Sequence, residues 1–485
     1  MKYDVIIVGA GVTGSLTARL LTLAGAHVLL AERNSDVASG TTKANSAIVH
    51  AGFDAEFGTM KASMNVSGCN KMPALAKELD VQYDNNGSLV CAFGADDEAA
   101  LRILYDRGLA NGVKKLEIIG QDQLRELEPY ISPEATAALW APTAGIICPW
   151  ELAIAACEVA EVNGARIERC FRVDSINRNE NNTLAVGGVY QNGSRAVFEA
   201  DYVVNAAGLY ADEVAKCAGD VLPFEIIPRR GEHLLLDREF GSQAKHTLFS
   251  VPSERGKGIL VSPTVHGNLI LGPNAVKVDK EDLATTNDGI AEIKKGAIRL
   301  IPSVNLRGTI TSFSGIRPTP SSKDFYIKLS EKLPGLVHAA GIDSPGLAAS
   351  PAIAEYITKL LGDMGLKTEA LQNPLTRPEF IRFNELSDSD KAKIIAGNSA
   401  YGKIVCRCET ITEGEIVDAI LRPVGARDLD AVKRRVRAGM GRCQGGFCSP
   451  RVTELLAREL GLEMEDITKR GDGSKLVYKD TERAE

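Results

Sequence analysis

A glycine pattern near the N-terminus restricts the fold of this chain more than any other feature. A short apolar run, residues 3–8, precedes Gly9, Gly11 and Gly14, and a helical pattern of leucines follows them. A second apolar run, residues 27–32, comes directly after the helix. Apolar runs of this length are typical of buried parallel strands. The segments therefore predict a βαβ unit and a protein of the α/β class.

The spacing G-x-G-x-x-G between a strand and a helix predicts a dinucleotide site. Gly9 permits the tight turn, Gly11 lets the backbone approach a pyrophosphate, and Gly14 lets the helix pack closely on the strand. The helix N-terminus offers N–H groups to the phosphates. Glu32 ends the second strand, where it can accept both ribose hydroxyls and would repel a 2′-phosphate, which disfavours NADP. The spacing alone does not distinguish FAD from NAD.

The length of 485 residues predicts two or three domains. A strand pattern returns at residues 201–208, and a further glycine-rich stretch follows residues 336–341. These later strand and glycine patterns predict a discontinuous Rossmann-like domain with a substrate domain inserted between its pieces. Residues 222–237 and 258–272 are rich in β-branched side chains and predict a sheet in that α+β insert.

Charge and hydropathy restrict the partners. The net charge of −7 provides no general attraction to nucleic acid, so no nucleic-acid partner is expected. No apolar run approaches the roughly 20 residues that a membrane span needs. The N-terminus shows no basic region or cleavage signal. We expect a cytoplasmic protein that reaches the inner face of a membrane only through a partner.

Three further segments resemble the FAD-contacting loops of the glycine/D-amino-acid-oxidase-like flavoprotein superfamily. They are residues 39–52, residues 203–208 with Asp212, and residues 341–347, and the resemblance covers most of residues 1–365. It implies FAD as the cofactor. The residues that we expect to contact FAD are Gly9, Gly11, Gly14, Glu32, Arg33, Ser39, Thr41, Thr42, Asn45, Ser46, Val173, Ala207, Gly208, Gly341, Ile342, Ser344, Gly346 and Leu347.

A helix is expected to follow the third of these loops. Ser350 can cap it and Pro351 can occupy its first turn. A helix N-terminus beside the flavin N1–C2=O edge would stabilise the negative charge of reduced flavin. A capped helix with a purely structural role is the alternative.

The ten cysteines fall into two groups. Four form two close pairs, Cys406 with Cys408 and Cys443 with Cys448. A C-x-C pair is less usual for zinc and suits a [2Fe–2S] cluster, although spacing alone leaves zinc open. The others are expected to be small buried hydrophobic residues: Cys69, Cys91, Cys148, Cys157, Cys170 and Cys217.

Local signals around the four cysteines predict a small helical domain. Thr412 and Glu415 form a capping-box pattern, Ser449 opens a last helix and Gly461 ends it. Five basic residues crowd the second cysteine pair. A solvated helix face or a nucleic-acid patch would explain them, but we favour compensation of an anionic cluster or docking of an acidic electron partner. They are Lys433, Arg434, Arg435, Arg437 and Arg442.

Residues 403–460 resemble the bacterioferritin-associated-ferredoxin-like [2Fe–2S] domain. The resemblance is strongest to the version in the FAD subunits of anaerobic glycerol-3-phosphate dehydrogenases, which share the stretch Val405-Cys-Arg-Cys-Glu409 and the pattern Gly439-Met-Gly-x-Cys-Gln-Gly-x-x-Cys448. It implies a [2Fe–2S] cluster on Cys406, Cys408, Cys443 and Cys448. It also implies a separate redox partner subunit or electron acceptor.

The predicted domains follow from these motifs. They are an FAD-binding domain at residues 1–80, 141–215 and 331–372, a substrate domain at 81–140 and 216–330, a linker at 373–402, a [2Fe–2S] domain at 403–462 and a tail at 463–485, in which disorder is expected after Gly471.

The flavoprotein resemblance implies hydride transfer from a substrate C–H to flavin N5, with a base accepting the hydroxyl or amine proton. His50 lies in the loop expected to reach the flavin and is the first candidate for the base, and His233 is the second. Arg317 is the expected anchor for an anionic substrate. Arg230 and Lys257 are weaker candidates for that role.

The substrate expectation combines two resemblances. The C-terminal domain indicates sn-glycerol 3-phosphate, oxidised to dihydroxyacetone phosphate. The segments Arg230–His233, Leu271–Asn274 and Gly341–Gly346 resemble L-2-hydroxyglutarate oxidases, so a 2-hydroxy or amino acid is the alternative. An adjacent cluster favours a dehydrogenase over an oxidase. A non-catalytic electron-transfer flavoprotein and a redox or iron sensor are further alternatives.

Overall fold

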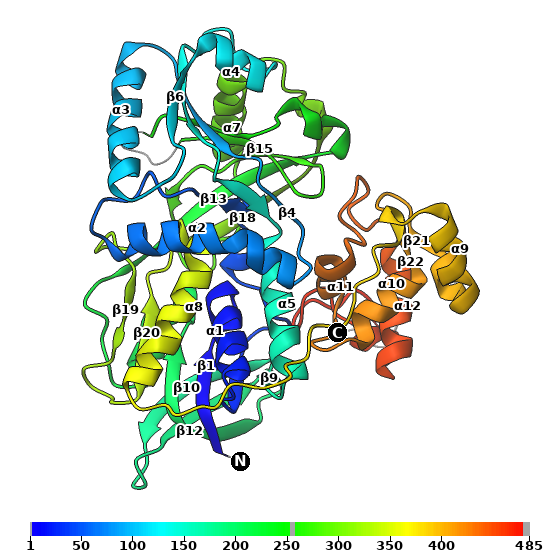
Figure 1. The fold of residues 1–485 in the computed structure, drawn as a ribbon. Coiled ribbons are helices and arrows are strands. Elements are labelled where there is room, and N and C mark those ends of the chain that lie inside the picture. The colour runs from blue at the N-terminus through cyan, green and yellow to red at the C-terminus, as the bar shows by residue number, and fades with distance from the viewer. Residues whose placement is uncertain (1, 253–257, 479–485) are drawn as a thin grey trace.

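Two large β-sheets and a C-terminal helical domain make up the structure, a computed structural model that describes residues 2–252 and 258–478 (Figure 1). The first sheet has the strand order β10-β11-β12-β1-β2-β9, and β20 pairs with both β12 and β19. Its strands are β1 (Lys2–Val8), β2 (Val28–Ala31), β9 (Arg166–Glu168), β10 (Phe171–Arg178), β11 (Leu184–Tyr190), β12 (Arg195–Asn205), β19 (Tyr326–Leu329) and β20 (Leu336–Ala340).

The predicted βαβ unit at the N-terminus is confirmed. Strand β1 runs parallel to β2, with Val5 opposite Val28, and helix α1 (Val12–Leu23) connects them. Val5 packs into a core shared with helices α1, α5 (Pro149–Val162) and α8 (Gly346–Asp363), while Ile6 packs into a second core with strands β10 to β12. Burial on both faces is the physical reason why this strand is an unbroken apolar run.

The second sheet has the order β17-β13-β16-β15-β14-β5-β7-β6, with β18 paired to β13. Its strands are β5 (Ser88–Ala92), β6 (Glu117–Gly120), β7 (Ala137–Ala141), β13 (Ile226–Leu236), β14 (Thr247–Ser250), β15 (Leu260–Pro263), β16 (Leu269–Gly272), β17 (Val276–Lys277) and β18 (Thr309–Pro320). Helices α3 (Ala95–Ala110), α4 (Gln121–Leu127) and α7 (Asn287–Leu300) pack on it. Two separate parts of the chain therefore build the inserted domain, as the predicted fold class requires.

A small sheet and two helices lie close to both large sheets. Strand β8 (Gly145–Ile147) pairs with β3 (Ile48–Val49) and with β4 (Tyr83–Asp84). Helix α2 (Met60–Glu78) packs against α8, and α6 (Ala211–Cys217) packs against β10 and β20. The small sheet brings the start of α5 beside the loop that contains His50.

Three predicted boundaries differ from the structure. Strand β19 already belongs to the first sheet, so the nucleotide-binding unit resumes before residue 331. The predicted linker contains helix α9 (Asp388–Gly397), which the Ser387 hydroxyl caps by accepting the amide of Asp390. In the predicted tail Ile467 is buried in a core and Thr468 is bridged to Lys475, so the chain directly after Gly471 is not disordered as expected. Residues 479–485 lie outside the described residues.

The C-terminal domain is built as its local signals predict. A hairpin of β21 (Ile404–Cys406) and β22 (Ile411–Thr412) precedes helices α10 (Glu413–Leu421), α11 (Leu429–Val436) and α12 (Ser449–Leu460). The Thr412–Glu415 capping box is present, and Gly461 ends α12 at a φ of +65°. Across the part of the chain that the structure describes, no helix combines the length and apolarity needed to cross a membrane.

The basic residues of the C-terminal domain mainly attach it to the rest of the protein. Asp36 is fully buried and pairs with Arg434 at 2.6 Å and Arg435 at 2.8 Å. Burial raises the pKa of Asp36, but the charges of Arg435 and Arg434 outweigh this effect and hold that pKa well below its usual value. Arg442 pairs with Asp237 of the inserted domain at 2.6 Å. These contacts correct the expectation of a free docking or charge-compensating surface.

Replacing Asp36 by asparagine is expected to weaken the attachment of the C-terminal domain. The change leaves Arg434 and Arg435 buried without a carboxylate, which costs about 3–5 kcal/mol. Calorimetry should therefore show a lower thermal midpoint. The control, Asp363→Asn, removes an exposed pair with Lys359 and should cost less than about 1 kcal/mol. Equal midpoints for the two variants would contradict the expectation.

Candidate active site and cofactor sites

A cavity of about 960 Å³ lies between the two sheets. Its wall includes the β1–α1 turn, residues 39–46, the end of β2, strands β13 and β18, and residues 342–347. It includes every residue that we expect to contact FAD except Gly14 and Gly341. His50, His233 and Arg317 also line it. The fold thus brings segments from five parts of the sequence to one space.

The glycines of the turn occupy positions that no other residue fits. Gly9 has a φ of +105°, and a Cβ there would lie 2.6 Å from the carbonyl oxygen of Ala206. A Cβ on Gly14 would lie 1.9 Å from the carbonyl oxygen of Gly9. Gly14 therefore allows α1 to pack on the turn without itself reaching the cavity. The turn leaves the backbone open to a pyrophosphate, as a dinucleotide site requires.

Glu32 is a buried carboxylate at the edge of the cavity. Its Oε2 accepts the amide of Ala10 at 2.9 Å, and its Oε1 accepts the backbone and side-chain N–H groups of Asn34 at 2.9 and 2.6 Å. Acceptor capacity remains on Oε2. The residue thus supports the glycine turn and can still accept a ribose hydroxyl, so the cavity fits a dinucleotide whose adenosine lies at this end.

The loop over residues 39–46 is held by its own side chains. The Thr41 hydroxyl donates to the carbonyl oxygen of Ile316 in β18 at 2.8 Å, and the Asn45 amide donates to the carbonyl oxygen of Thr42 at 2.9 Å. The Thr42 hydroxyl accepts the amide of Val12 at 3.0 Å. These bonds position the loop between the two sheets.

Helix α8 begins earlier than predicted. Pro345 is its N-cap residue and Gly346 its first residue, whereas Pro351 lies inside the helix. The Ser350 hydroxyl donates to the carbonyl oxygen of Leu347 at 2.8 Å and caps nothing. The first turn, rather than a later one, therefore lines the cavity. This placement still puts a helix N-terminus at the cavity wall.

The two candidate histidines have different environments. His233 is buried, stacks on Phe313 at 4.7 Å between ring centres, and its Nε2 lies 3.2 Å from the Ser46 hydroxyl. Burial and the charge of Arg317 lower the pKa of His233 to about 3. A neutral imidazole with that pKa is a poor base near neutral pH. His50 is therefore the better candidate, and its ring lies 5.7 Å from that of Phe249.

Arg317 lies opposite a second arginine. In the antiparallel pair of β13 and β18, Arg229 and Arg317 are direct partners, and both line the cavity. Within residues 2–252 and 258–478, Arg317 makes no ion pair with a carboxylate, and its guanidinium donates only a 3.4 Å bond to the carbonyl oxygen of Asn274. Two cations opposite each other repel unless an anion lies between them. Arg229 carries no signal in the sequence, because only the strand register places it opposite Arg317.

One of the two weaker anion candidates is held by carboxylates. Arg230 is buried in ion pairs with Glu232 at 3.1 Å and Asp282 at 2.6 Å, so it supports the structure. Lys257, the other candidate, lies outside the described residues. Lys61, which carries no signal in the sequence, lines the cavity and pairs with Asp343 at 2.7 Å.

The four C-terminal cysteines come together as two adjacent pairs. The sulfur atoms of Cys408 and Cys443 are 3.7 Å apart, and the Cys448 thiol donates a hydrogen bond to Cys406. That bond and the backbone N–H groups of Gly439 and Glu409 outweigh burial and lower the pKa of Cys406 to about 6. Thiolates with backbone N–H donors suit an iron–sulfur cluster. Cys408 is exposed, so this centre reaches the surface.

Family comparisons agree with both sites. The sequence profile described as FAD dependent oxidoreductase matches residues 4–360. The chain belongs to this family. The profile described as BFD-like [2Fe-2S] binding domain matches residues 404–458. FAD and a [2Fe–2S] cluster are therefore the cofactors of this oxidoreductase, which resolves the FAD–NAD and cluster–zinc alternatives.

Similar proteins match either nearly the whole chain or about three quarters of it. A glycerol 3-phosphate dehydrogenase from Caloramator mitchellensis is 45% identical and matches 98% of both chains. The structure of L-alpha-glycerophosphate oxidase from Mycoplasma pneumoniae with FAD bound superposes with a TM-score of 0.72 at 30% identity, covering 77% of this chain and 97% of the oxidase. An L-2-hydroxyglutarate dehydrogenase from Caenorhabditis elegans is 28% identical over 74% of this chain and 92% of its own length.

Proposed function

We propose that this flavoprotein is a dehydrogenase that oxidises sn-glycerol 3-phosphate to dihydroxyacetone phosphate. The observation that carries the proposal is the Arg229–Arg317 pair on the cavity wall, which requires a small anion for charge balance. The fork of Arg317 suits two phosphate oxygens. The full-length likeness to a glycerol 3-phosphate dehydrogenase supports phosphate as that anion.

The bound FAD would supply a two-electron acceptor for the hydride of the substrate carbinol carbon. In this proposal Arg317 and Arg229 hold the phosphate, and His50 accepts the proton of the hydroxyl that is oxidised. His233, held neutral by burial, positions Ser46 and the loop that carries it. The four cysteines hold the cluster through which the electrons leave.

An anaerobic titration tests this function. Protein with both cofactors intact is mixed with sn-glycerol 3-phosphate, then with L-2-hydroxyglutarate, then with simple amino acids, while the visible spectrum is followed. Bleaching of the flavin and then of the cluster by glycerol 3-phosphate alone is the expected result. Bleaching by L-2-hydroxyglutarate would favour the second substrate. Bleaching by none of them, but by a reduced partner protein, would favour an electron-transfer flavoprotein.

Replacing His50 by asparagine is expected to lower kcat by about 10²–10³, because asparagine cannot accept the substrate proton. Stopped-flow flavin reduction measures the step directly. The control is His27→Asn, which changes a partly buried histidine just before β2 that does not line the cavity, and it should leave the rate unchanged. A His50→Asn rate within a few-fold of the control would remove His50 from the role of base.

A redox partner completes the proposal. Cys408 is exposed, and Phe447 beside the second cysteine pair is 87% exposed, which suits an electron acceptor that docks over this face of the cluster. We propose that the acceptor is a separate protein subunit and that any membrane contact is made through it. The cytoplasmic location remains the expectation from sequence.

A further inference from the structure

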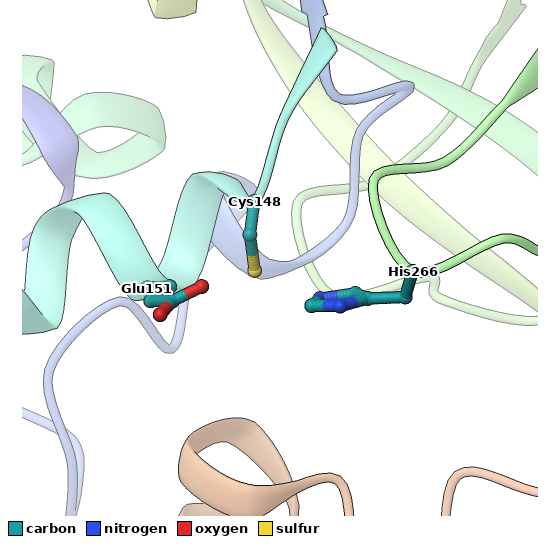
Figure 2. A group of neighbouring side chains, drawn as sticks. All are labelled: Cys148, Glu151 and His266. Atoms are coloured by element: carbon teal, nitrogen blue, oxygen red, sulfur yellow. The ribbon is translucent and has the colours of Figure 1, made fainter. Parts of the chain in front are cut away.

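Three side chains with metal-binding atoms meet outside the active site (Figure 2). Cys148 is the N-cap residue of α5, Glu151 lies in the first turn of that helix, and His266 lies in the turn between β15 and β16. Figure 2 shows the Cys148 thiol pointing into the space between the Glu151 carboxylate and the His266 ring. One ligand atom of each lies within 4.8 Å of the others. None of the three lines the FAD cavity.

Each of the three side chains has an atom that remains available to bind a metal ion. The Nε2 of His266 is buried and has no hydrogen-bond partner among the described residues. Glu151 accepts Arg382 at 2.8 Å through Oε1, which leaves Oε2 for another partner. Cys148 is buried at the N-cap of α5, and its sulfur faces the other two groups, so it can bind a metal ion once it loses its proton to that ion. Burying an imidazole nitrogen without a hydrogen bond or a metal ion costs free energy, so a bound ion at this nitrogen would be stabilising.

Carboxylates outside the cluster offset most of the positive charge near it. Arg437 and Arg238 share Glu409, at 2.8 and 2.5 Å. Arg382 pairs with Asp80 at 3.0 Å as well as with Glu151. Deprotonated Cys148 and Glu151 would add two negative charges, so the site can accept a divalent cation despite the nearby arginines.

We propose that Cys148, Glu151 and His266 bind a divalent transition-metal ion of the zinc class. One thiolate, one imidazole and one carboxylate are a ligand set that Zn²⁺ uses, with a fourth position left for water. Metal–ligand bonds of about 2.0–2.3 Å place tetrahedral ligand atoms about 3.3–3.8 Å apart, so small side-chain rotations close the present separations. On binding, the S–H bond of Cys148 breaks, a metal–sulfur bond forms, and the proton leaves to solvent.

The position of the site indicates a structural role. Cys148 and Glu151 belong to the nucleotide-binding unit, whereas His266 belongs to the inserted domain. The same turn reaches the C-terminal domain, since the Asn268 side chain accepts Arg437 at 3.1 Å. A bound ion would therefore link the two large units beside the attachment of the iron–sulfur domain, separately from both established cofactors.

Cobalt binding tests the site on the full chain with FAD and the cluster intact. After removal of loosely bound metal by a chelator, Co²⁺ is added and the thiolate-to-cobalt absorption is read as a difference spectrum. We expect one Co²⁺ per FAD in the wild type, displaced by Zn²⁺. Cys148→Ala should abolish the band, and His266→Gln should weaken Co²⁺ binding at least tenfold.

Controls separate this site from the other thiols. Cys157 is a buried cysteine on the same helix, so Cys157→Ala should bind Co²⁺ as the wild type does. Iron per FAD, measured in every variant, shows that the cluster is retained. No Co²⁺ band in the wild type, or an unchanged band in Cys148→Ala, would overturn the proposal. If Cys148→Ala does not accumulate, unweakened binding by His266→Gln would overturn it equally.

Discussion

The Cys443→Ala variant is expected to lose the visible absorbance and the iron of the cluster while it retains FAD. Cys443 is one of the four proposed ligands, and its sulfur lies 3.7 Å from that of Cys408. Three thiolates do not hold a [2Fe–2S] cluster stably. The FAD cavity contains no residue of the cysteine loop, so flavin binding should be preserved.

Loss of the cluster should affect only one of the two half-reactions, the transfer of electrons from the flavin to an acceptor. Flavin reduction by substrate should keep its rate, whereas steady-state reduction of a one-electron acceptor should fall by about 100-fold or more. Rapid-mixing spectroscopy measures the first rate and acceptor turnover the second. The control is Cys91→Ala, which removes a buried cysteine of strand β5 that does not line the FAD cavity. If turnover survives in Cys443→Ala without iron, the cluster is not the electron exit.

Arg317→Ala is expected to lower kcat/KM for the anionic substrate by about 10³, since removing one partner of a buried charge pair costs roughly 3–5 kcal/mol. The loss should appear mainly in KM if Arg317 holds the phosphate equally in the ground and transition states. Arg317→Lys should recover only part of it, because an ammonium cannot bind two oxygens as a planar fork does.

Arg229→Ala provides the matched comparison on the facing strand. Arg229 is exposed, whereas Arg317 is partly buried. The loss of Arg229 should therefore lower kcat/KM for the anionic substrate by only about tenfold. Flavin reduction by dithionite should be equal in all variants, which excludes a damaged flavin site. An Arg317→Ala enzyme with normal KM and kcat would show that the anion binds elsewhere.

Local sequence patterns predicted the elements whose structure depends on neighbouring residues. The glycine turn, the apolar run of β1 and the Thr412–Glu415 capping box are present as expected. Each depends on a few consecutive residues whose backbone conformation or burial is encoded by their own side chains. The cysteines differ, because the structure joins each member of one sequence pair to a member of the other, Cys408 to Cys443 and Cys406 to Cys448.

Other predictions were wrong where contacts with distant parts of the chain determine the local structure. Ser350 and Pro351 carry cap signals, yet α8 begins at Gly346, and the residues before it form part of the cavity wall. Helix α9 formed in a stretch that its proline and polar composition marked as a linker. The sequence predicted that the basic residues around the cysteines are available to a partner. In the structure, Arg434 and Arg435 instead pair with Asp36, nearly 400 positions away in the chain.

Sequence by itself predicted a dinucleotide site and a metal centre, because the glycine turn and the cysteine pairs are patterns of local spacing, and the family profiles then identified FAD and the [2Fe–2S] cluster. The tertiary structure decided which charged groups are available to a ligand. It placed Arg229 opposite Arg317, buried His233 beside Arg317 so that its pKa falls, and brought Cys148 and Glu151 to His266. Strand register and burial set distances and pKa values between residues far apart in the chain, and one-dimensional spacing carries no information about either.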